Sequence, residues 1–273
     1  MRFSVIDGGL STVLEEMGEH PSGPLWTAAA LVDRPEVLVE AHRRFVDAGA
    51  DIVISASYQA SEPGVSRDQL ASTTELVRRA GAREVACSIG PFGACLGDGS
   101  EYDGHYDASW DEVRAFHRRR LDVLVATEPD WFAIETMPTR AEAEIVVEEL
   151  RQLTSAPAWV TFTCRDEKST HGGDRLAAAA AAVTDAVQAV GVNCTAPGLV
   201  TALLQSIDTT LPKVAYPNHG RRWDAAHDCW IGDGELDLTD HVADWLAAGA
   251  RYIGGCCGVG TEGIAALRRL RDT

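Results

Sequence analysis

The stretch "RYIGGCCGVGTEGIAALRRLRD" (251–272) contains one complete strand, turn and helix. Its first part, "RYIGGCC" (251–257), is a short apolar run that ends in glycine and two adjacent cysteines. The apolar residues are continuous rather than alternating, which is typical of a buried parallel strand. The second part, "GTEGIAALRRLRD" (260–272), has helical periodicity. The stretch therefore predicts one strand–helix unit of an α/β fold with a parallel sheet.

Seven more apolar, β-branched runs precede this unit, and helical patterns lie between them. The seven runs are "FSVIDGG" (3–9), "DIVISASY" (51–58), "EVACSIG" (84–90), "WFAIET" (131–136), "AWVTFTC" (158–164), "AVGVNC" (189–194) and "KVAYPN" (213–218). Eight evenly spaced strand–helix units predict a (β/α)8 TIM barrel, with a doubly wound open sheet as the alternative. No linker rich in Pro, Gly or Ser divides the chain, so we expect a single domain over residues 1–273.

Three of the predicted helices carry capping signals. The helical pattern that begins at Pro35 is followed by Gly49, and glycine suits the left-handed residue after a helix. Ser109 precedes acidic residues and is expected to cap the helix that follows. Thr139 and Glu142 have the spacing of a capping box, in which each side chain bonds the backbone N–H of the other residue.

The chain is acidic, because 41 Asp and Glu against 24 Lys and Arg give a formal net charge of −17. Such a surface repels phosphate backbones and anionic lipids, so we expect neither nucleic acids nor membranes as partners. No run approaches the length of a membrane-spanning helix, and the first residues do not resemble a signal peptide, so we expect a cytoplasmic protein. The seven cysteines are an odd number, which favours free thiols or metal ligands over a disulfide framework.

Three of the cysteines fall at the predicted carboxyl ends of two nearby strands. Cys194 ends "GVNC" (191–194), and Cys256 and Cys257 follow the last strand. Adjacent strands lie about 4.8 Å apart, so these thiols can converge on one ion at the mouth of the barrel. Three thiolates select zinc, and three protein ligands leave a fourth position open, as in catalytic zinc sites. The sequence therefore predicts a zinc site with one open coordination position.

Other polar residues also collect at the predicted strand ends, where the active site of a barrel is built. They are Asp7, Ser55, Ser57, Tyr58, Gln59, Glu135, Thr136, Cys164, Asn193, Asn218 and His219. From the pattern alone, Asp7 is equally suited to cap the next helix, and Glu135 is equally suited to pair with an arginine. The long irregular segment 90–107 follows the third predicted strand, and long loops in such places are usually functional.

Seven motifs, in order along essentially the whole chain, resemble the homocysteine S-methyltransferase family. The pairing of "GVNC" (191–194) with "GGCCG" (254–258) is the most specific of them. The other five are "DGGLSTVLEEMG" (7–18), "ISASYQAS" (54–61), "GPFGACLGDGSEYDGHY" (90–106), "IET" (134–136) and "YPNHG" (216–220). The motif at 90–106 resembles the branch that uses S-methylmethionine or S-adenosylmethionine, rather than the branches that use betaine or folate.

The resemblance implies a zinc-dependent enzyme that transfers a methyl group from a sulfonium donor to homocysteine and so makes methionine. Zn²⁺ is the implied cofactor, held by Cys194, Cys256 and Cys257. The reactive group is then the zinc-bound thiolate of the substrate, and no general acid is needed because a neutral thioether leaves. Homocysteine and the sulfonium donor are the implied partners. The C-terminal arm that betaine-using relatives employ for assembly is absent, which favours a monomer.

The resemblance also implies how homocysteine is bound. Asp7 and Glu135 are expected to contact its ammonium group, and the backbone N–H groups of Gly8 and Gly9 are expected to receive its carboxylate. The residues expected to line the rest of the amino-acid pocket are Ser55, Ser57 and Asn193. Either Tyr58 or Gln59 is expected to supply a fourth zinc ligand when homocysteine is absent.

The donor site is implied less closely. A sulfonium cation suits aromatic faces, so aromatic residues near the mouth of the barrel are candidates. The donor-site candidates are Trp26, Phe92, Tyr102, Tyr106 and His219. Many relatives have "NSG" where this chain has "NHG" (218–220), so His219 alters one wall of the pocket.

Two other functions share part of this pattern. A non-catalytic zinc or thiol sensor built on the same barrel would use the three cysteines but would need neither Asp7 nor Glu135 at the mouth. A methyltransferase acting on another small thiol, or on a selenol such as selenocysteine, would keep the chemistry and change only the acceptor.

Overall fold

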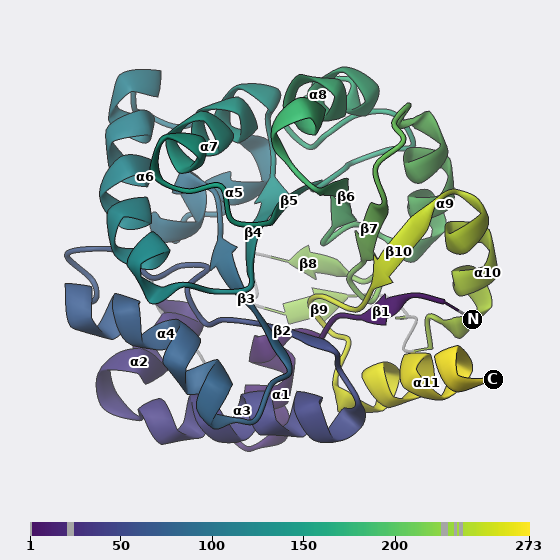
Figure 1. Ribbon diagram of the computed structural model, residues 1–273, viewed down its shortest axis with the longest axis horizontal. Coiled ribbons are helices and arrows are strands. Elements are labelled where there is room, and N and C mark those ends of the chain that lie inside the picture. Colours follow the sequence, from purple (N-terminus) through teal and green to yellow (C-terminus); the bar gives the residue numbers. More distant parts are fainter. Residues whose placement is uncertain (1, 21–24, 225–228, 232–233, 235–236) are drawn as a thin grey trace.

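The computed structural model describes residues 2–20, 25–224, 229–231, 234 and 237–273. Eight parallel strands form one sheet in the order β1-β10-β7-β6-β5-β4-β3-β2, and a parallel bridge between Ile6 and Ile52 joins β1 to β2. The sheet is therefore closed into a barrel, and helices surround it (Figure 1). The predicted (β/α)8 barrel is confirmed. The doubly wound alternative is wrong, because its open sheet would have two unpaired edges.

Each run that we predicted as a strand overlaps one strand of the barrel. The strands are β1 Ser4–Val5, β2 Ile52–Ile54, β3 Glu84–Ile89, β4 Trp131–Met137, β5 Ala158–Phe162, β6 Ala189–Asn193, β7 Lys213–Tyr216 and β10 Ala250–Ile253. Most are shorter than the apolar run, because the last residues of the run leave the ladder and enter the loops at the mouth. An antiparallel hairpin that the sequence did not predict, β8 Arg222–Asp224 and β9 Cys229–Ile231, follows β7.

Helices connect successive strands and form the outer layer of the barrel. They are α1 Leu10–Glu16, α2 Ala29–Asp33, α3 Pro35–Ala48, α4 Arg67–Arg79, α5 Ser100–Asp103, α6 Trp110–Leu124, α7 Arg140–Leu153, α8 Leu176–Val183, α9 Pro197–Ser206, α10 Thr239–Ala247 and α11 Thr261–Asp272. The 3₁₀ turns are η1 Trp26–Ala28, η2 Phe92–Cys95, η3 Val125–Thr127 and η4 Thr184–Ala186. The loop 90–107 thus contains η2 and α5. Within the part of the chain that is described, no helix is long and apolar enough to cross a bilayer.

Two of the three predicted caps are confirmed, and the third is only half formed. Gly49 ends α3 with φ of 98°, and Ser109 and Glu112 form a complete capping box at the start of α6. Thr139 accepts a hydrogen bond from the Glu142 N–H at 3.3 Å. The carboxylate of Glu142, however, does not return to Thr139 but turns inward and is fully buried. A tertiary network therefore competes successfully with the local cap.

Apolar side chains fill the protein in two layers. The inner layer lies within the barrel, and its largest members are Trp159 and Tyr216. The outer layer lies between the strands and the helices, and it includes Phe45, Leu121 and Phe162. Because the strands are parallel, all their carboxyl ends meet at one end of the barrel, where the polar strand-end residues gather.

Candidate metal centre and active site

The three cysteines that the sequence singled out meet at the mouth of the barrel. The sulfur of Cys257 lies 3.9 Å from the sulfur of Cys194 and 3.9 Å from the sulfur of Cys256, and all three sulfurs lie within 4.8 Å of one another. Tetrahedral zinc with Zn–S bonds of about 2.3 Å separates its sulfurs by about 3.8 Å, so the cluster fits a tetrahedral ion. Cys164, which also ends a strand, is not part of this cluster.

The backbone holds the two adjacent cysteines in place. The N–H of Cys256 donates to the carbonyl of Pro217 at 2.7 Å, and the carbonyl of Cys257 accepts from the N–H of His219 at 2.9 Å. Gly258 has φ of 79°, and a Cβ there would lie 2.1 Å from the His219 ring. The glycine is therefore required twice, by its left-handed backbone and by the close approach of the imidazole.

The three thiols differ in pKa. Hydrogen bonds from the Cys194 and Cys256 thiols lower the pKa of Cys257 well below its usual value, and the nearby His219 lowers it further. The pKa of Cys256 is correspondingly raised, mainly by the bonds that it makes to Cys194 and Cys257. Cys257 is thus the thiol that ionises first, and an anionic sulfur at the mouth favours the arrival of a cation.

Glu135 lies beside the thiols as a buried carboxylate, only 7% exposed. It accepts hydrogen bonds from the Ser88 hydroxyl and, at 3.1 Å, from the Tyr216 hydroxyl. Burial raises the pKa of Glu135 to about 7, although these two bonds oppose the shift, and the charge of Cys257 adds to it. A carboxylate of this kind is stabilised when a cation binds next to it.

Asp7 is the second buried carboxylate at the mouth, and it is 3% exposed. One oxygen, Oδ2, accepts a hydrogen bond from the N–H of Ile54 at 2.9 Å and so ties β1 to β2. The other, Oδ1, is buried and has no hydrogen-bond partner among the described residues. Burial raises the pKa of Asp7 well above its usual value, and Glu135 raises it further. Two buried carboxylates that destabilise each other's charge form a place for a cation.

Ser55 and Ser57 belong to a hydrogen-bond chain that leads to Glu135. Their hydroxyls lie 2.8 Å apart, and the Ser57 hydroxyl donates to the carbonyl of Ser88 at 2.8 Å. Ser55 accepts from the Ser88 N–H at 3.1 Å, and the Ser88 hydroxyl in turn donates to Glu135. The two serines therefore hold β2 against β3 and orient Ser88. Their direct contact with substrate stays a prediction.

Two residues expected to bind substrate also make hydrogen bonds within the protein, and their contact with substrate stays a prediction. Asn193 is fully buried, and its side chain accepts from the N–H of Thr136 at 2.7 Å and donates to the Thr136 hydroxyl at 2.8 Å. Thr136 at the end of β4 and Cys194 just after β6 both have left-handed backbones, with φ of 60° and 45°. Asn193 therefore links two strand ends that each contain a left-handed residue. The N–H of Gly9 donates to the carbonyl of Val259 at 3.0 Å, which leaves Gly8 as the predicted contact for the carboxylate.

Gly9 has a packing role in addition. A Cβ at this position would lie 2.7 Å from the carbonyl oxygen of Cys256 and 2.8 Å from the Thr12 hydroxyl. That hydroxyl accepts a hydrogen bond from the N–H of Gly258 at 2.9 Å. The first and last strand–helix turns therefore pack directly on each other, and glycine at position 9 lets the cysteine turn approach β1.

Of the two residues expected to provide a fourth ligand, Tyr58 has a phenol whose pKa responds to the charge of Cys194. Burial raises the pKa of its phenol well above the usual value, and the nearby Glu101 and Cys194 raise it further. Its ring packs on Gly90, where a Cβ would lie 2.7 Å from two ring carbons. For Gln59, the contact that the structure shows is made by its backbone carbonyl, which accepts from the Cys95 thiol at 3.4 Å. Tyr58 is thus the better candidate of the pair.

A buried arginine on α6 holds the turn that carries Tyr58. The guanidinium of Arg120 donates to the carbonyls of Gly90 at 3.0 Å and Tyr58 at 2.7 Å, and also to that of Ser57. Burial raises the pKa values of Glu135 and Cys87, and the positive charge of Arg120 partly opposes both shifts. Arg120 therefore joins the carboxyl ends of β2 and β3, and sequence reasoning missed it because its partners are backbone carbonyls far away in the chain.

The loop 90–107 brings one of its aromatic candidates to the thiols and leaves two further away. The hydroxyl of Tyr102 lies 4.0 Å from the sulfur of Cys194. Phe92 and Tyr106 instead contact each other edge to face, with ring centroids 5.2 Å apart, and Phe92 packs on Phe116. Tyr102 is therefore the aromatic residue of the loop that can face a methyl donor, while Phe92 and Tyr106 form the support of the loop.

The remaining two donor-site candidates differ in position. His219 is buried beside the cysteine turn, as the contact of its ring with Gly258 shows. Trp26 lines a separate cavity of about 210 Å³ between α1 and the turn that precedes α2, together with Leu14 and His20. The structure thus places His219 at the thiols, and for Trp26 a role in donor binding stays a prediction.

Glu101 is an acidic residue of the loop that comes close to the thiols. Its Oε2 atom is buried and has no hydrogen-bond partner among the described residues. Burial raises its pKa, and the charges of Asp98 and Cys257 contribute. Ser88, Tyr216 and Arg120 also serve the site without having been singled out in the sequence. The position of Tyr216 at the end of an apolar run was the one signal that could have found it.

Glu142 anchors this loop to the barrel. Its carboxylate accepts from the Phe92 N–H at 2.5 Å, from the Tyr106 hydroxyl at 2.6 Å and from His117 Nε2 at 2.9 Å. Burial of His117 lowers its pKa, while the bond to Glu142 opposes that shift. One buried side chain on α7 thus fixes both ends of the loop that carries Tyr102.

Replacing Glu142 by alanine should therefore destabilise the protein strongly. The buried His117 and two partly buried donors, the Phe92 N–H and the Tyr106 hydroxyl, would lose their partner, and losses of this kind cost about 3–5 kcal/mol. We expect a fall in Tm of about 10 °C and faster cleavage of the loop by a protease. The matched control is Glu144→Ala, two residues away on α7, where a partly exposed pair with Arg140 is lost and little change is expected. Equal Tm values for the two variants would contradict the anchor role.

Known proteins of similar sequence agree with what the geometry of the site indicates. A family model described as homocysteine S-methyltransferase matches residues 4–270. The homocysteine S-methyltransferase of Escherichia coli K12 is 39% identical over 97% of this chain and 94% of that protein. Homocysteine S-methyltransferase 4 of Zea mays is 38% identical over 97% of this chain and 88% of that protein.

Solved structures agree with the sequence relatives. The metallated form of the homocysteine methyltransferase MmuM from Escherichia coli superposes with a TM-score of 0.85 at 36% identity, covering 98% of this chain and 96% of that one. The apo form of the same protein superposes with a TM-score of 0.78 at 33% identity, covering 99% and 96%. The barrel, the cysteine cluster and the match along nearly the whole chain lead to one conclusion. This chain is a methyltransferase that belongs to the homocysteine S-methyltransferase family.

Proposed function

We propose that this enzyme transfers a methyl group from a sulfonium donor to the thiolate of homocysteine and so forms methionine, with Zn²⁺ as its cofactor. The observation that carries the proposal is the meeting of three thiols and two buried carboxylates at one mouth. Thiolates are soft metal ligands, and the carboxylates suit the ammonium of an amino acid. A substrate with a thiol at one end and an α-amino group at the other complements both.

Cys194, Cys256 and Cys257 would hold the zinc ion. Their sulfur separations of 3.9 Å fit tetrahedral coordination, as described above. The similar Escherichia coli protein has been crystallised in a metallated form. When bound, Zn²⁺ lowers the pKa of a coordinated thiol and would thus supply the homocysteine thiolate at neutral pH.

The buried carboxylates orient the amino acid. The unpartnered Oδ1 of Asp7 and the carboxylate of Glu135 receive the substrate ammonium, which removes the unfavourable interaction between their two charges. Ser88 and Tyr216 keep the Glu135 carboxylate pointing at the mouth. The amino acid is then held at its far end, so that its sulfur lies next to the cysteine cluster.

The transfer itself needs no proton from the protein. The thiolate sulfur forms a bond to the donor methyl carbon, while the bond from that carbon to the sulfonium sulfur breaks and leaves its electron pair on a neutral thioether. The contribution of the chain is to align the two sulfurs and to exclude water. Tyr102 and the unpartnered carboxylate oxygen of Glu101 border the space next to the thiols, and a carboxylate there favours a cationic donor.

Two alternatives remain as outcomes of experiment. The sensor function needs no carboxylates at the mouth, and the presence of Asp7 and Glu135 next to the cluster favours an enzyme. Acceptors other than homocysteine, including selenocysteine, would use the same thiol cluster. An assay of zinc-loaded protein with each acceptor and a sulfonium donor tests both points, because a sensor would produce no methylated product. We expect the active species to be a monomer.

Among the donors, S-methylmethionine should be used better than S-adenosylmethionine, and betaine should be inert. Tyr102 and Glu101 of the loop 90–107 lie beside the thiols, and S-methylmethionine needs no room for a nucleoside. Two methionines should form in each turnover with this donor, one from each substrate. The measurement is kcat/KM for the three donors at fixed homocysteine. A higher value for S-adenosylmethionine, or any turnover of betaine, would show that the loop has been misinterpreted.

A pair of variants tests the same loop. Glu101→Gln should raise the KM for S-methylmethionine about tenfold, because one charge facing the sulfonium is lost. Asp103→Asn is the matched control, since this acid lies on the same loop but is exposed to solvent and pairs with His105. The KM for homocysteine should stay unchanged in both variants. If Asp103→Asn has the larger effect, then Glu101 does not face the donor.

A further inference from the structure

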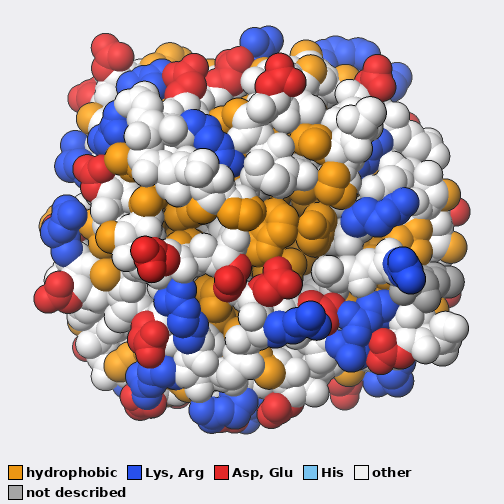
Figure 2. Space-filling view, in the orientation of Figure 1, with side chains coloured by type: hydrophobic (Ala, Val, Ile, Leu, Met, Phe, Trp, Pro, Cys, Tyr) orange, Lys and Arg blue, Asp and Glu red, His pale blue; other side chains and the backbone are white. Residues whose placement is uncertain are grey.

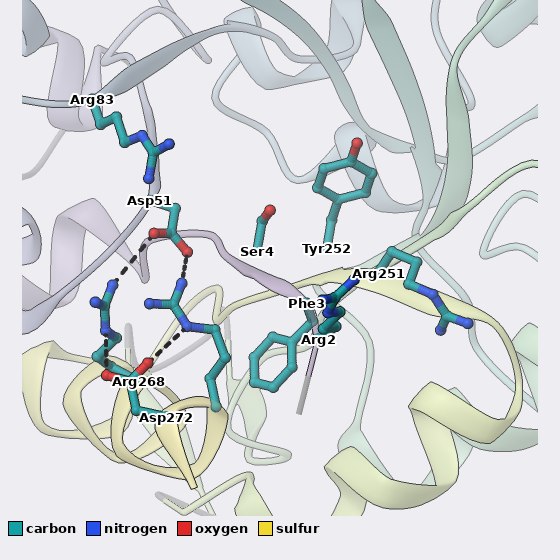
Figure 3. Close-up of a pocket in the computed structure, with 10 residues that line it drawn as sticks. Arg2, Phe3, Ser4, Asp51, Arg83, Arg251, Tyr252, Arg268 and Asp272 are labelled. Carbon is teal, nitrogen blue, oxygen red and sulfur yellow. Dashed lines mark hydrogen bonds and ion pairs between the residues drawn. The ribbon is translucent and has the colours of Figure 1, made fainter.

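A second pocket lies at the opposite end of the barrel from the cysteines. It has a volume of about 640 Å³ and is lined by the residues at the starts of β1, β2 and β3, by β10 and by the end of α11. Figure 3 shows the side chains that line it. The strands of the barrel are parallel, so the starts of the strands lie one barrel length away from the thiol cluster. We call this cavity the basal pocket.

The charge of the basal pocket is opposite to that of the protein as a whole. Five arginines and two aspartates line it, in a chain whose formal net charge is −17. On the face shown in Figure 2, both basic and acidic side chains border an apolar centre. A cavity lined mainly by one sign of charge attracts counter-ions, because its walls focus the electric field.

Both aspartates are already neutralised within the fold. Asp51 accepts from Arg268 at 3.3 Å, from Arg271, and from the backbone N–H of Val5 at 2.9 Å. Asp272 accepts from Arg268 Nε at 3.0 Å and from Arg271 Nε at 3.2 Å. These four side chains form the cluster of dashed contacts in Figure 3 and tie α11 to the start of β2. Their charges balance, so they do not make the pocket basic.

The excess positive charge comes from the other three arginines. Arg2 and Arg83 are exposed to solvent and have no ion pair or hydrogen bond within the described part of the chain. Arg251 donates to the backbone carbonyls of Leu246 and Ala250, and it has no carboxylate partner among the described residues. Three arginines from three different segments thus line one cavity, and none of them has a carboxylate partner among the described residues. Arginines that serve only as solvated surface residues would not need to gather around one cavity.

We propose that the basal pocket binds a small molecule that carries two or more phosphate charges. Guanidinium groups bind phosphate oxygens in pairs of parallel hydrogen bonds, which makes arginine the preferred side chain for this anion. The volume lies within the range of small-molecule sites, of roughly 300–1,000 Å³. The net charge of the chain repels a nucleic acid, so a phosphorylated metabolite is the class of ligand that fits. The site is independent of the methyl-transfer site.

The test is a calorimetric titration of the zinc-loaded enzyme with inorganic pyrophosphate. Wild type should show one saturable site, and raising the salt concentration should weaken it. The double variant Arg2→Gln/Arg83→Gln should bind at least about tenfold more weakly, because two charged hydrogen-bonding groups are lost. Its methyl-transfer rate and Tm should equal those of wild type, since both arginines are exposed and remote from the thiols. The control is Arg67→Gln/Arg119→Gln, which removes the same charge from exposed positions on α4 and α6.

Each result bears on the proposal. Weaker binding in the Arg2/Arg83 variant, with wild-type binding in the control, supports the basal pocket. The absence of saturable binding by wild type would overturn it. Equal affinity in the Arg2/Arg83 variant and wild type would also overturn it, and would assign the pyrophosphate to the metal instead. Equal weakening in both double variants would reduce the effect to net charge and remove the site.

Discussion

Replacing Cys256 and Cys257 together by serine should abolish both zinc binding and methyl transfer. The double variant keeps only one of the three sulfurs that converge at the mouth, and one thiolate cannot hold the ion. The loss of thiolate generation at neutral pH should lower kcat/KM by about 10³-fold or more. Metal analysis of protein purified under reducing conditions without chelator should find one zinc per chain in wild type and none in the variant.

Cys164→Ser provides the matched control for the cysteine variant. Cys164 is also buried at a strand end, and burial raises its pKa to about 12, but it does not belong to the cluster. This variant should keep one zinc per chain and wild-type kinetics. Full zinc content in the Cys256→Ser/Cys257→Ser variant would remove the proposed site altogether.

Glu135→Gln should raise the KM for homocysteine about 100-fold, while making the substrate-free protein more stable at alkaline pH. The kinetic effect follows from loss of the charge that faces the substrate ammonium, since one partner of a buried ion pair is worth a few kcal/mol. The variant keeps the shape of the side chain, so Ser88 and Tyr216 keep a hydrogen-bonding partner. The KM for homocysteine and the Tm at alkaline pH should therefore both rise, which replacement of a purely structural residue would not produce.

The stability effect has a definite pH range. The pKa of Glu135 is raised in the folded protein from 4.5 to about 7, so between these values the folded state binds more protons than the unfolded state. The free energy of unfolding therefore falls as the pH rises through this range, and the full cost applies above it. Glutamine cannot ionise and removes that cost. We expect a gain of up to about 3 kcal/mol at pH 8 and no gain near pH 4.

Thermal unfolding of wild type and Glu135→Gln between pH 4 and pH 8 measures this effect. Asp122→Asn, an exposed acid on α6, is the control, and its Tm should follow wild type at every pH. A Tm of the Glu135→Gln variant that lies below wild type at pH 8, with an unchanged KM for homocysteine, would return Glu135 to a structural role.

Several elements of the site could be predicted from the sequence because their signals are local. The glycine and cysteine turn at 254–258 stands next to an apolar run, and so does the carboxylate of Glu135. In a parallel barrel, the end of each run is also the mouth, so position along the chain translates into position in space. This is why the sequence alone predicts that Cys194, Cys256 and Cys257 come together.

Other roles depended on partners distant in the chain. Glu142 has the spacing of a capping box, yet its carboxylate bonds Tyr106 and His117 instead of the backbone of Thr139. Asn193 lies at a strand end like a substrate ligand, yet it braces Thr136, 57 residues away. A buried polar group takes whichever partners the packed interior offers, because leaving a buried donor or acceptor unpaired costs more than changing its local partner.

The sequence by itself determined the order of the eight strands, the place where the thiols gather and the family, because hydrophobic periodicity and glycine turns act over a few residues. Only the tertiary structure decided which side chains are engaged and which are open. It placed the phenol of Tyr58 where the charge of Cys194 acts on it, engaged the N–H of Gly9 with Val259, and collected uncompensated arginines at the opposite end of the barrel. These outcomes depend on distances between residues far apart in the chain, which only closure of the barrel sets.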